Sequence, residues 1–245
     1  MNQSRIDTLV VSTLGDAEID AAKSVYVGID EQPPTYDAGV PEYARIVADL
    51  IGSMKPASVL EFGANAGRNL DLIRQRHADC LYRGVDVNPL NVERGKTRFG
   101  LDLITADEAW LPAQPDDSVE VAFTVSVIDH MPYPEDVLRH LLRVSSQYLV
   151  LFELAHDRLG RATHNLVHDD ATATLAPVYR YSYIHDYRHE CERKFGALCI
   201  ADLRVPIGKA NLWDLYRLYV FTKRRELFGD SLLAQFSMRP ILRSA

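Results

Sequence analysis

The chain has 245 residues, which is enough for one large domain or for a domain with shorter appendages. Apolar residues make up 47% of it and charged residues 25%, as is typical of a globular, water-soluble protein. Its formal net charge of -7 disfavours a role in binding duplex nucleic acid, because an acidic surface repels phosphate backbones.

The cysteines and the apolar segments predict a reducing compartment and no membrane span. Cys80, Cys191 and Cys199 form an odd set without CxxC spacing, which indicates reduced, mostly buried thiols. The start of the chain lacks the basic and apolar regions of a signal peptide, and no apolar run reaches about 18 residues. We therefore expect a cytoplasmic protein.

Predicted helices and strands alternate along most of the chain. Pro41 opens a predicted helix over residues 41–52, since proline is tolerated in a first helical turn. Apolar residues at helical spacing and end signals predict further helices over residues 66–77, 89–100, 134–144 and 183–195. Apolar runs predict seven strands, at residues 57–62, 80–87, 101–105, 118–126, 148–154, 198–206 and 215–222.

This alternation predicts an α/β fold, a Rossmann-like seven-stranded and mostly parallel sheet with helices on both faces. The last two strands lie too close in sequence for a crossover helix, so we expect them to pair antiparallel at one edge, with the last strand antiparallel in the sheet. A helical cap with a short helix near residues 16–24 precedes the sheet, and an irregular insert follows the fifth strand.

A glycine loop follows the first predicted strand. Glu61 and Phe62 end that strand, and Gly63 and Gly67 bracket a tight turn into the next helix. Missing Cβ atoms let a ligand approach the backbone, and parallel sheets bind ligands beyond the carboxyl ends of their strands. The spacing does not fit the G-x-G-x-x-G dinucleotide fingerprint, which argues against a nicotinamide oxidoreductase. A plain strand-to-helix turn is the alternative.

The loop resembles the acidic-x-G-x-x-x-G segment of class I S-adenosylmethionine-dependent methyltransferases. Three later segments resemble segments of that family and occur in the family's order. They are ADEAWLP at residues 106–112, DDSVEVA at 116–122 and SVIDHMP at 126–132. Between them and the loop, GVDVNP at residues 84–89 places Asp86 at the end of the second strand. The matches cover roughly residues 57–154, and their order is more specific than any single segment.

The resemblance implies S-adenosylmethionine as cofactor. It implies that Asp86 accepts hydrogen bonds from the ribose hydroxyls and that Asp107 or the adjacent backbone contacts the adenine amino group. Asn65 replaces the family's middle glycine, and asparagine tolerates unusual backbone angles better than most residues. The full set of expected cofactor-binding residues is Glu61, Gly63, Ala64, Asn65, Gly67, Asp86, Val87, Asp107, Glu108 and Ser126.

A hydroxyl acceptor benefits from a general base, whereas an amine needs only to arrive deprotonated. The expected catalytic residues are His130 after the fourth strand and Glu153 and His156 at the end of the fifth. His130 is the first choice, because its loop faces the methyl group in related folds. Two alternatives stay open: His130 as a structural histidine near the helix start, and Glu153 as a cap of the strand end.

The histidines near the insert form two pairs at i, i+4 spacing, His164 with His168 and His185 with His189. On a helix such a pair lies on one face and could bind a divalent metal. The insert is not clearly helical, and neither an HExxH motif nor a cysteine ligand set is present. We therefore expect no metal.

The resemblance and the polar insert predict a small-molecule acceptor, with O-methylation of a sugar or another hydroxylated biosynthetic intermediate as the leading hypothesis. A methyltransferase acting on RNA or protein and a non-catalytic cofactor-binding scaffold are the alternatives. We divide the chain into a cap segment at residues 1–45, a methyltransferase domain at 46–225 with a substrate-side insert at 155–181, and a tail at 226–245. The apolar residues of the tail would dock on the core or on the second subunit of a homodimer.

Overall fold

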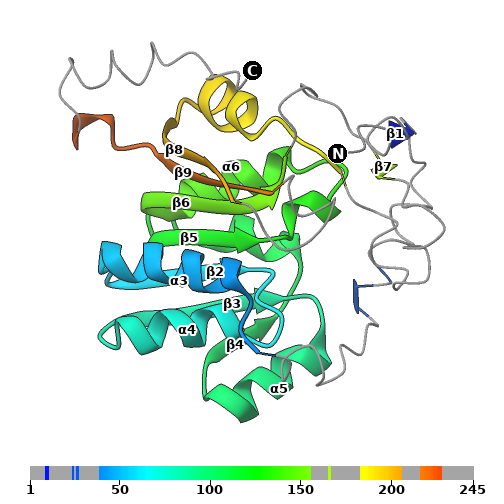
Figure 1. Ribbon diagram of the computed structural model, residues 1–245, viewed down its shortest axis with the longest axis vertical. Coiled ribbons are helices and arrows are strands. Elements are labelled where there is room, and N and C mark those ends of the chain that lie inside the picture. The colour runs from blue at the N-terminus through cyan, green and yellow to red at the C-terminus, as the bar shows by residue number, and fades with distance from the viewer. Residues whose placement is uncertain are drawn as a thin grey trace.

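A seven-stranded sheet organises the chain in the computed structural model, which describes residues 9–10, 24, 26–27, 39–155, 165–166, 183–205 and 216–227. The strands lie in the order β4-β3-β2-β5-β6-β9-β8 (Figure 1). They are β2 (Ser58–Phe62), β3 (Leu81–Asp86), β4 (Asp102–Thr105), β5 (Val119–Val125), β6 (Ser145–Leu154), β8 (Leu198–Arg204) and β9 (Tyr216–Thr222).

All neighbouring strands pair in parallel except at β9, which is antiparallel to both β6 and β8. This arrangement confirms the predicted seven-stranded, mostly parallel α/β fold with an antiparallel last strand. From β2 the chain builds the sheet outward through β3 and β4, and then returns to add β5 on the other side. The strand order therefore reverses between β2 and β5, the point at which open α/β sheets bind ligands.

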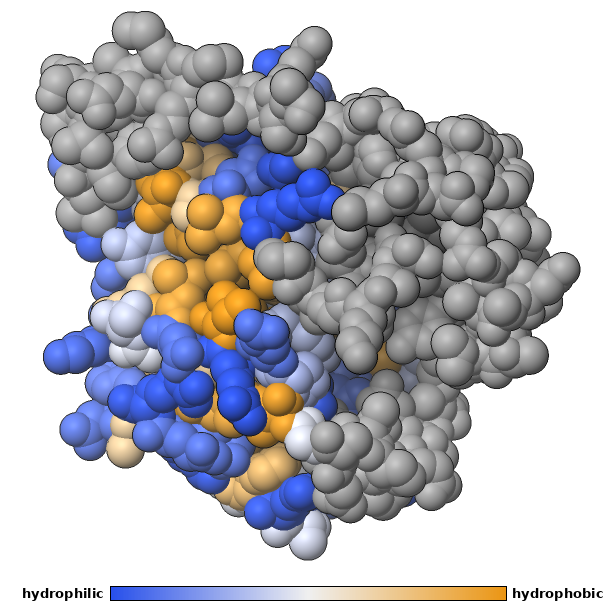
Figure 2. Space-filling view, in the orientation of Figure 1, coloured by the Kyte–Doolittle hydropathy of each residue, from blue (hydrophilic) through white to orange (hydrophobic). Residues whose placement is uncertain are grey.

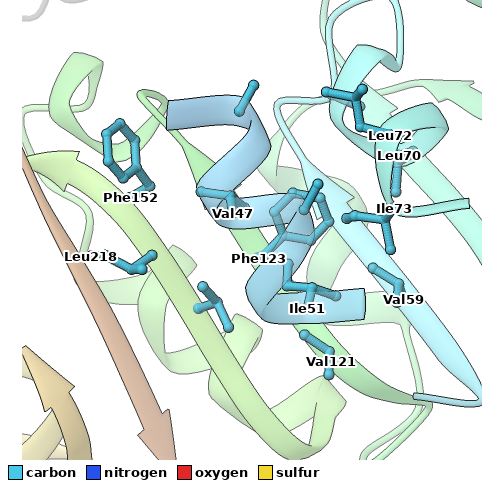
Figure 3. Packing of buried hydrophobic residues seen from close by; sticks show 14 of the residues in the cluster. Val47, Ile51, Val59, Leu70, Leu72, Ile73, Val121, Phe123, Phe152 and Leu218 are labelled. Carbon is cyan, nitrogen blue, oxygen red and sulfur yellow. The ribbon is translucent and has the colours of Figure 1, made fainter. Parts of the chain in front are cut away.

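Helices cover both faces of the sheet. In Figure 1, α3 (Glu42–Met54) and α4 (Arg68–Arg76) lie in front of the sheet, and α6 (Glu135–Val144) lies behind it. A buried cluster joins α3, α4 and α5 (Pro89–Phe99) to one face, and a second cluster joins α6 to the other. Figure 3 shows part of the first cluster, in which Val47 and Ile51 of α3 meet Phe123 of β5. Burial of apolar surface stabilises such clusters by about 25 cal/mol per Å².

The ends of α5 follow from local sequence. The Oδ1 atom of Asn88 accepts hydrogen bonds from the backbone N–H groups of Leu90 and Asn91, at 3.0 and 3.2 Å. Pro89 occupies the first turn, where its missing N–H costs nothing. Gly100 ends the helix with φ 63°, a left-handed conformation that glycine adopts without a Cβ penalty. The predicted start of this helix at Pro89 and its predicted end near Gly100 are both confirmed.

The predicted helix over residues 183–195 is wrong at its start. The helical residues begin at Tyr187, and the segment His189–Lys194 has π-helical hydrogen bonding. Upstream, the N–H of Tyr183 donates to the carbonyl of Asp129 at 2.6 Å, and His185 Nε2 lies 2.8 Å from the carbonyl of Met131. These contacts hold the chain extended along the exit of β5. The strand β6 also begins at Ser145 rather than at residue 148, because α6 passes directly into it.

The N-terminal segment pairs with the region after β6. The two-residue strand β1 (Leu9–Val10) lies antiparallel to β7 (Asn165–Leu166). Most of the predicted helix near residues 16–24 and all residues after 227 lie outside the described residues, and the domain boundaries at 45 and 225 remain predictions.

On the face shown in Figure 2, hydrophobic residues gather above a hydrophilic lower part, and Ile46, Leu50 and Met54 of α3 are only partly buried.

All three cysteines are free thiols, as predicted, and Cys191 and Cys199 are buried. Within the described residues, no helix combines the length and the apolar character needed to cross a membrane.

Candidate functional site

The loop after β2 folds back onto the end of β3. The N–H groups of Gly63 and Ala64 donate to the carbonyl of Val85 at 2.8 and 3.0 Å. The next N–H, that of Asn65, donates to Asp86 Oδ2 at 2.7 Å. Asn65 has φ 51°, so it adopts the left-handed conformation expected of an asparagine in a glycine position. The loop therefore forms without the family's middle glycine.

The two glycines of the loop are required by both conformation and space. Gly63 and Gly67 each have φ 76°. A Cβ atom on Gly63 would lie 2.2 Å from Val127 Cγ2, and one on Gly67 would lie 2.7 Å from Leu101 Cδ1. Such distances are far below van der Waals contact, so larger residues would displace these neighbours. The loop therefore packs directly against residue 127 at the exit of β5.

Glu61 lies beneath the loop. Its carboxyl is fully buried, and its Oε1 atom accepts a hydrogen bond from Asn69 Nδ2 at 2.7 Å. Burial raises the pKa of Glu61 to about 8. Its Oε2 atom has no hydrogen-bond partner within the described part of the chain. The hydrogen bond between Glu61 and Asn69 links β2 to α4.

Asp86 stands between the loop and the start of α5. Its Oδ2 atom accepts from the N–H of Asn65, and its Oδ1 atom accepts from the N–H of Asn88 at 2.9 Å. The residue is only partly buried, as is Val87 next to it. Because each carboxylate oxygen has two acceptor positions, these bonds leave capacity for a further donor such as a ribose hydroxyl.

Asp107 and Glu108 follow β4 on the same edge of the sheet. The N–H of Ala106 donates to the carbonyl of Asp86 at 2.9 Å, which places this segment beside the end of β3. Asp107 Oδ1 accepts from the N–H of Ala109 at 3.0 Å and caps a short 3-10 helix, Glu108–Ala113. The sequence-predicted residues after β2, β3 and β4 are thus brought to one edge.

The exit of β5 carries a polar cluster that the sequence predicted only in part. Ser126 has φ 53°, and its Oγ atom lies 2.7 Å from the hydroxyl of Tyr216 and 3.2 Å from Asp129 Oδ2. The hydroxyl of Tyr216 donates to the same Asp129 oxygen at 3.0 Å. Sequence reasoning missed Asp129 and Tyr216. Asp129 stands inside the SVIDHMP segment, whereas Tyr216 reaches this edge only because β9 runs antiparallel.

Glu153 lies at the end of β6 with its side chain fully buried. Its Oε1 atom accepts from Thr124 Oγ1 at 2.6 Å, and its Oε2 atom accepts from the N–H groups of Val127 and Asp129 at 3.0 and 3.2 Å. Burial, followed by the nearby Asp129 carboxylate, raises the pKa of Glu153 well above its ordinary value. The two oxygens therefore face the end of β5 and the segment that follows it.

His130 lies at the surface of this cluster. Its Nε2 atom is 3.7 Å from Asp129 Oδ1, and its side chain is 16% exposed. The ring of Tyr26 lies 4.8 Å from the imidazole, centroid to centroid. The carbonyl of Tyr26 accepts from Asn88 Nδ2 at 3.1 Å. Tyr26 therefore connects the β3 side of the site to the β5 side. His156 lies outside the described residues.

Of the two histidine pairs, the described one, His185 with His189, does not form a metal site. His185 precedes the helical residues and contacts the carbonyl of Met131, whereas His189 lies within the π-helical segment, so the two do not share a helix face. His164 and His168 lie outside the described residues. Among the residues described, no group of three or more His, Cys, Asp or Glu side chains could hold a metal ion.

Comparison with known proteins assigns this arrangement to a family. A sequence model described as a methyltransferase domain matches residues 36–191, which is more than half of the chain. None of the curated proteins matches it.

Solved structures share the fold at low sequence identity. The 1,6-didemethyltoxoflavin-N1-methyltransferase of Burkholderia thailandensis, with 1,6-didemethyltoxoflavin and S-adenosylhomocysteine bound, is 17% identical, and the match covers 88% of this chain and 93% of that chain with a TM-score of 0.63. An O-methyltransferase family protein of the same organism is 10% identical over 74% of this chain and 55% of its own, with a TM-score of 0.55. Human N-acetylserotonin methyltransferase in complex with S-adenosylmethionine is 12% identical over 74% and 52%, with a TM-score of 0.51.

Proposed function

The chain belongs to the methyltransferase domain family and uses S-adenosylmethionine as its methyl donor, and on this premise we propose that it methylates a hydroxyl group of a polar small molecule. A sugar or another hydroxylated biosynthetic intermediate is the acceptor class that we propose. The observation that carries the proposal is the cluster of imidazole, hydroxyl and carboxylate groups at the exit of β5, formed by His130, Ser126, Tyr216 and Asp129.

The donor side fits the residues present. Gly63, Asn65 and Gly67 all have positive φ angles, which fold this segment into a tight turn at the carboxyl end of β2, the edge at which such sheets bind ligands. Asp86 retains acceptor capacity for ribose hydroxyls, and Asp107 offers an acceptor for an amino group of the base. We assign cofactor contacts to these residues, with Ala64, Val87, Glu108 and Ser126 beside them and Glu61 acting through the loop. When bound, the cofactor supplies a methyl group activated by its sulfonium charge.

On the acceptor side, we assign proton removal to His130. Its imidazole is partly exposed, so an acceptor hydroxyl can reach it. An imidazole that takes up this proton has the Asp129 carboxylate as its neighbour, at 3.7 Å. Histidine suits this task because its charge changes near neutral pH. Alignment of donor and acceptor supplies much of the remaining acceleration of an in-line displacement. His156 stays a second candidate for the base.

Three alternatives to methylation of a small-molecule hydroxyl can be distinguished by experiment. The Burkholderia thailandensis neighbour is an N1-methyltransferase, so a nitrogen acceptor is the first alternative. RNA or protein as acceptor is the second, although the net charge of -7 disfavours a polyanion. A cofactor-binding scaffold without turnover is the third.

The test measures ligand binding and turnover separately. Thermal unfolding is recorded with S-adenosylmethionine, S-adenosylhomocysteine and NAD, because a ligand that binds only the folded state raises its stability. We expect both sulfur ligands to raise the Tm and NAD to leave it unchanged. Release of S-adenosylhomocysteine is then measured with matched panels of sugars, polyols, phenols and amines. Turnover with amines alone would contradict O-methylation, and binding without turnover on any panel, RNA or protein would favour the scaffold.

A further inference from the structure

We propose that Glu153 is a positioning residue of methyl transfer. It holds the segment after β5 so that the glycine loop on the donor side and His130 on the acceptor side keep their positions relative to each other. The proposal rests on the proposed function, because it assigns His130 and the glycine loop to one reaction. It replaces the role of general base for this residue with a role exerted through residues 124–130.

The hydrogen bonds of Glu153 converge on one short segment. Thr124 donates its hydroxyl from β5 at 2.6 Å, and the N–H groups of Val127 and Asp129 donate to Oε2 at 3.0 and 3.2 Å. Between them Ser126 has φ 53°, a left-handed conformation that is disfavoured for a residue with a Cβ atom. Such a backbone persists only where its surroundings hold it. The buried carboxyl of Glu153 supplies two of the contacts that do so.

The same segment reaches both halves of the site. Toward the donor side, the side chain of Val127 occupies the space beside Gly63, where a Cβ atom would lie 2.2 Å from Val127 Cγ2. Toward the acceptor side, the N–H of His130 donates to the carbonyl of Val127 at 3.0 Å. A shift of Val127 would therefore displace the glycine loop and the imidazole together. Glu153 bonds directly to the N–H of this residue.

The surroundings of Glu153 do not suit a general base. The side chain is fully buried, and both of its oxygens are engaged inside the protein. The titratable groups around it are Asp129 from the β5 exit, Tyr187 from the helix after the insert and Tyr216 from β9. Arg217, its partner in the β6–β9 pairing, is engaged by Asp202 at 2.6 Å.

Two carboxyls thus share a buried space. Asp129 accepts from the hydroxyls of Ser126 and Tyr216. Burial and the adjacent Asp129 raise the pKa of the Glu153 carboxyl, which favours its neutral form. A neutral glutamic acid resembles glutamine in shape and in having one acceptor oxygen and one donor. A Glu153→Gln variant can therefore keep the positioning contacts, although it cannot act as a general base.

The experiment compares Glu153→Gln and Glu153→Ala with the wild-type enzyme, and uses Glu93→Ala, an exposed glutamate of α5, as the control. Affinity for S-adenosylhomocysteine is measured by calorimetry, and kcat and KM are measured with the best acceptor. We expect Glu153→Gln to retain at least about a third of the wild-type kcat. We expect Glu153→Ala to lower kcat about 100-fold, since small misplacements have effects of that size, and to weaken cofactor binding as well.

The results distinguish a general base from a positioning residue. If Glu153→Gln loses as much kcat as Glu153→Ala while both bind the cofactor normally, Glu153 is the base and the proposal is overturned. If neither variant changes kcat or affinity, the segment does not depend on Glu153, which also overturns it. Should Glu153→Ala fail to fold, Glu153→Gln alone decides between base and positioning residue. If the wild type methylates no acceptor, the proposed function fails; cofactor affinity and the backbone amide spectrum of residues 126–131 then still test the positioning role.

Discussion

The hydroxyl of Tyr216 lies 2.7 Å from Oγ of Ser126, although 90 positions separate the two residues in the chain. The contact arises from topology, because the antiparallel strand β9 begins at the edge where the parallel strand β5 ends. The same hydroxyl donates to Asp129, whose carboxyl is buried. The one antiparallel strand in the sheet therefore contributes a side chain to the candidate active site.

Replacement of Tyr216 by phenylalanine tests this contact. Tyr216→Phe leaves the ring stacked on Phe152 but removes the donor to the Asp129 carboxylate. We expect the free energy of unfolding to fall by about 1.5–3 kcal/mol, the usual effect for a hydrogen bond to a charged group. Urea unfolding measures it, with the exposed Tyr133→Phe as control. An unchanged stability would show that the hydroxyl is dispensable.

The glycine loop predicts a steric effect at Gly63. Gly63→Ala introduces both a positive φ on a non-glycine residue and an overlap with Val127, whereas Gly100→Ala introduces a positive φ alone, with nothing within 4 Å of the new Cβ. We expect Gly100→Ala to lower stability by about 1 kcal/mol. Gly63→Ala adds about 1–3 kcal/mol for overpacking and weakens cofactor binding at least about tenfold. Equal effects of the two substitutions in urea unfolding and calorimetry would contradict the overlap.

Local patterns in the sequence predicted the strands, the caps of α5 and the positions of the acidic residues at the sheet edge. Asp86 and Asp107 were predictable because Asp86 ends one parallel strand and Asp107 comes two residues after the end of another, and such ends meet at one edge. Tyr216 was not, because its place depends on how distant strands are ordered. The helix start near Tyr183 was also misjudged, since contacts with the β5 exit override the local helical pattern.

Asp86 is expected to control cofactor affinity. Asp86→Ala removes an acceptor for ribose hydroxyls and the partner of the N–H groups of Asn65 and Asn88. We expect the Kd for S-adenosylhomocysteine to rise about 10- to 100-fold, and Asp86→Asn, which keeps one acceptor oxygen, to have a smaller effect. Calorimetry measures this, and Asp102→Ala, an exposed aspartate paired with Arg83, is the control. Unchanged affinity in Asp86→Ala would refute the ribose assignment.

His130 is expected to affect turnover more than binding. We expect His130→Ala to lower kcat by about 10²- to 10⁴-fold, as for loss of a general base, with the Kd of the cofactor changed less than about threefold. The control is His140→Ala on α6, where the histidine contacts Arg143 instead of the site. A parallel loss of turnover and cofactor affinity would instead identify His130 as a structural histidine.

Glu61 predicts a specific dependence of stability on pH. Burial raises its pKa from the ordinary 4.5 to about 8, so between these values the folded protein holds a proton that the unfolded chain has released. The contribution of this group to stability is therefore complete below pH 4.5 and falls as the pH rises toward 8, by up to about 1.4 kcal/mol per pH unit. Glu61→Gln cannot titrate but can keep the contact with Asn69 through its amide. We expect urea unfolding across this range to show a smaller loss of stability in Glu61→Gln than in the wild type, with Glu93→Gln as control. Parallel curves for Glu61→Gln and the wild type would mean that Glu61 is charged in the folded protein, and the buried contact with Asn69 would then have to stabilise a carboxylate.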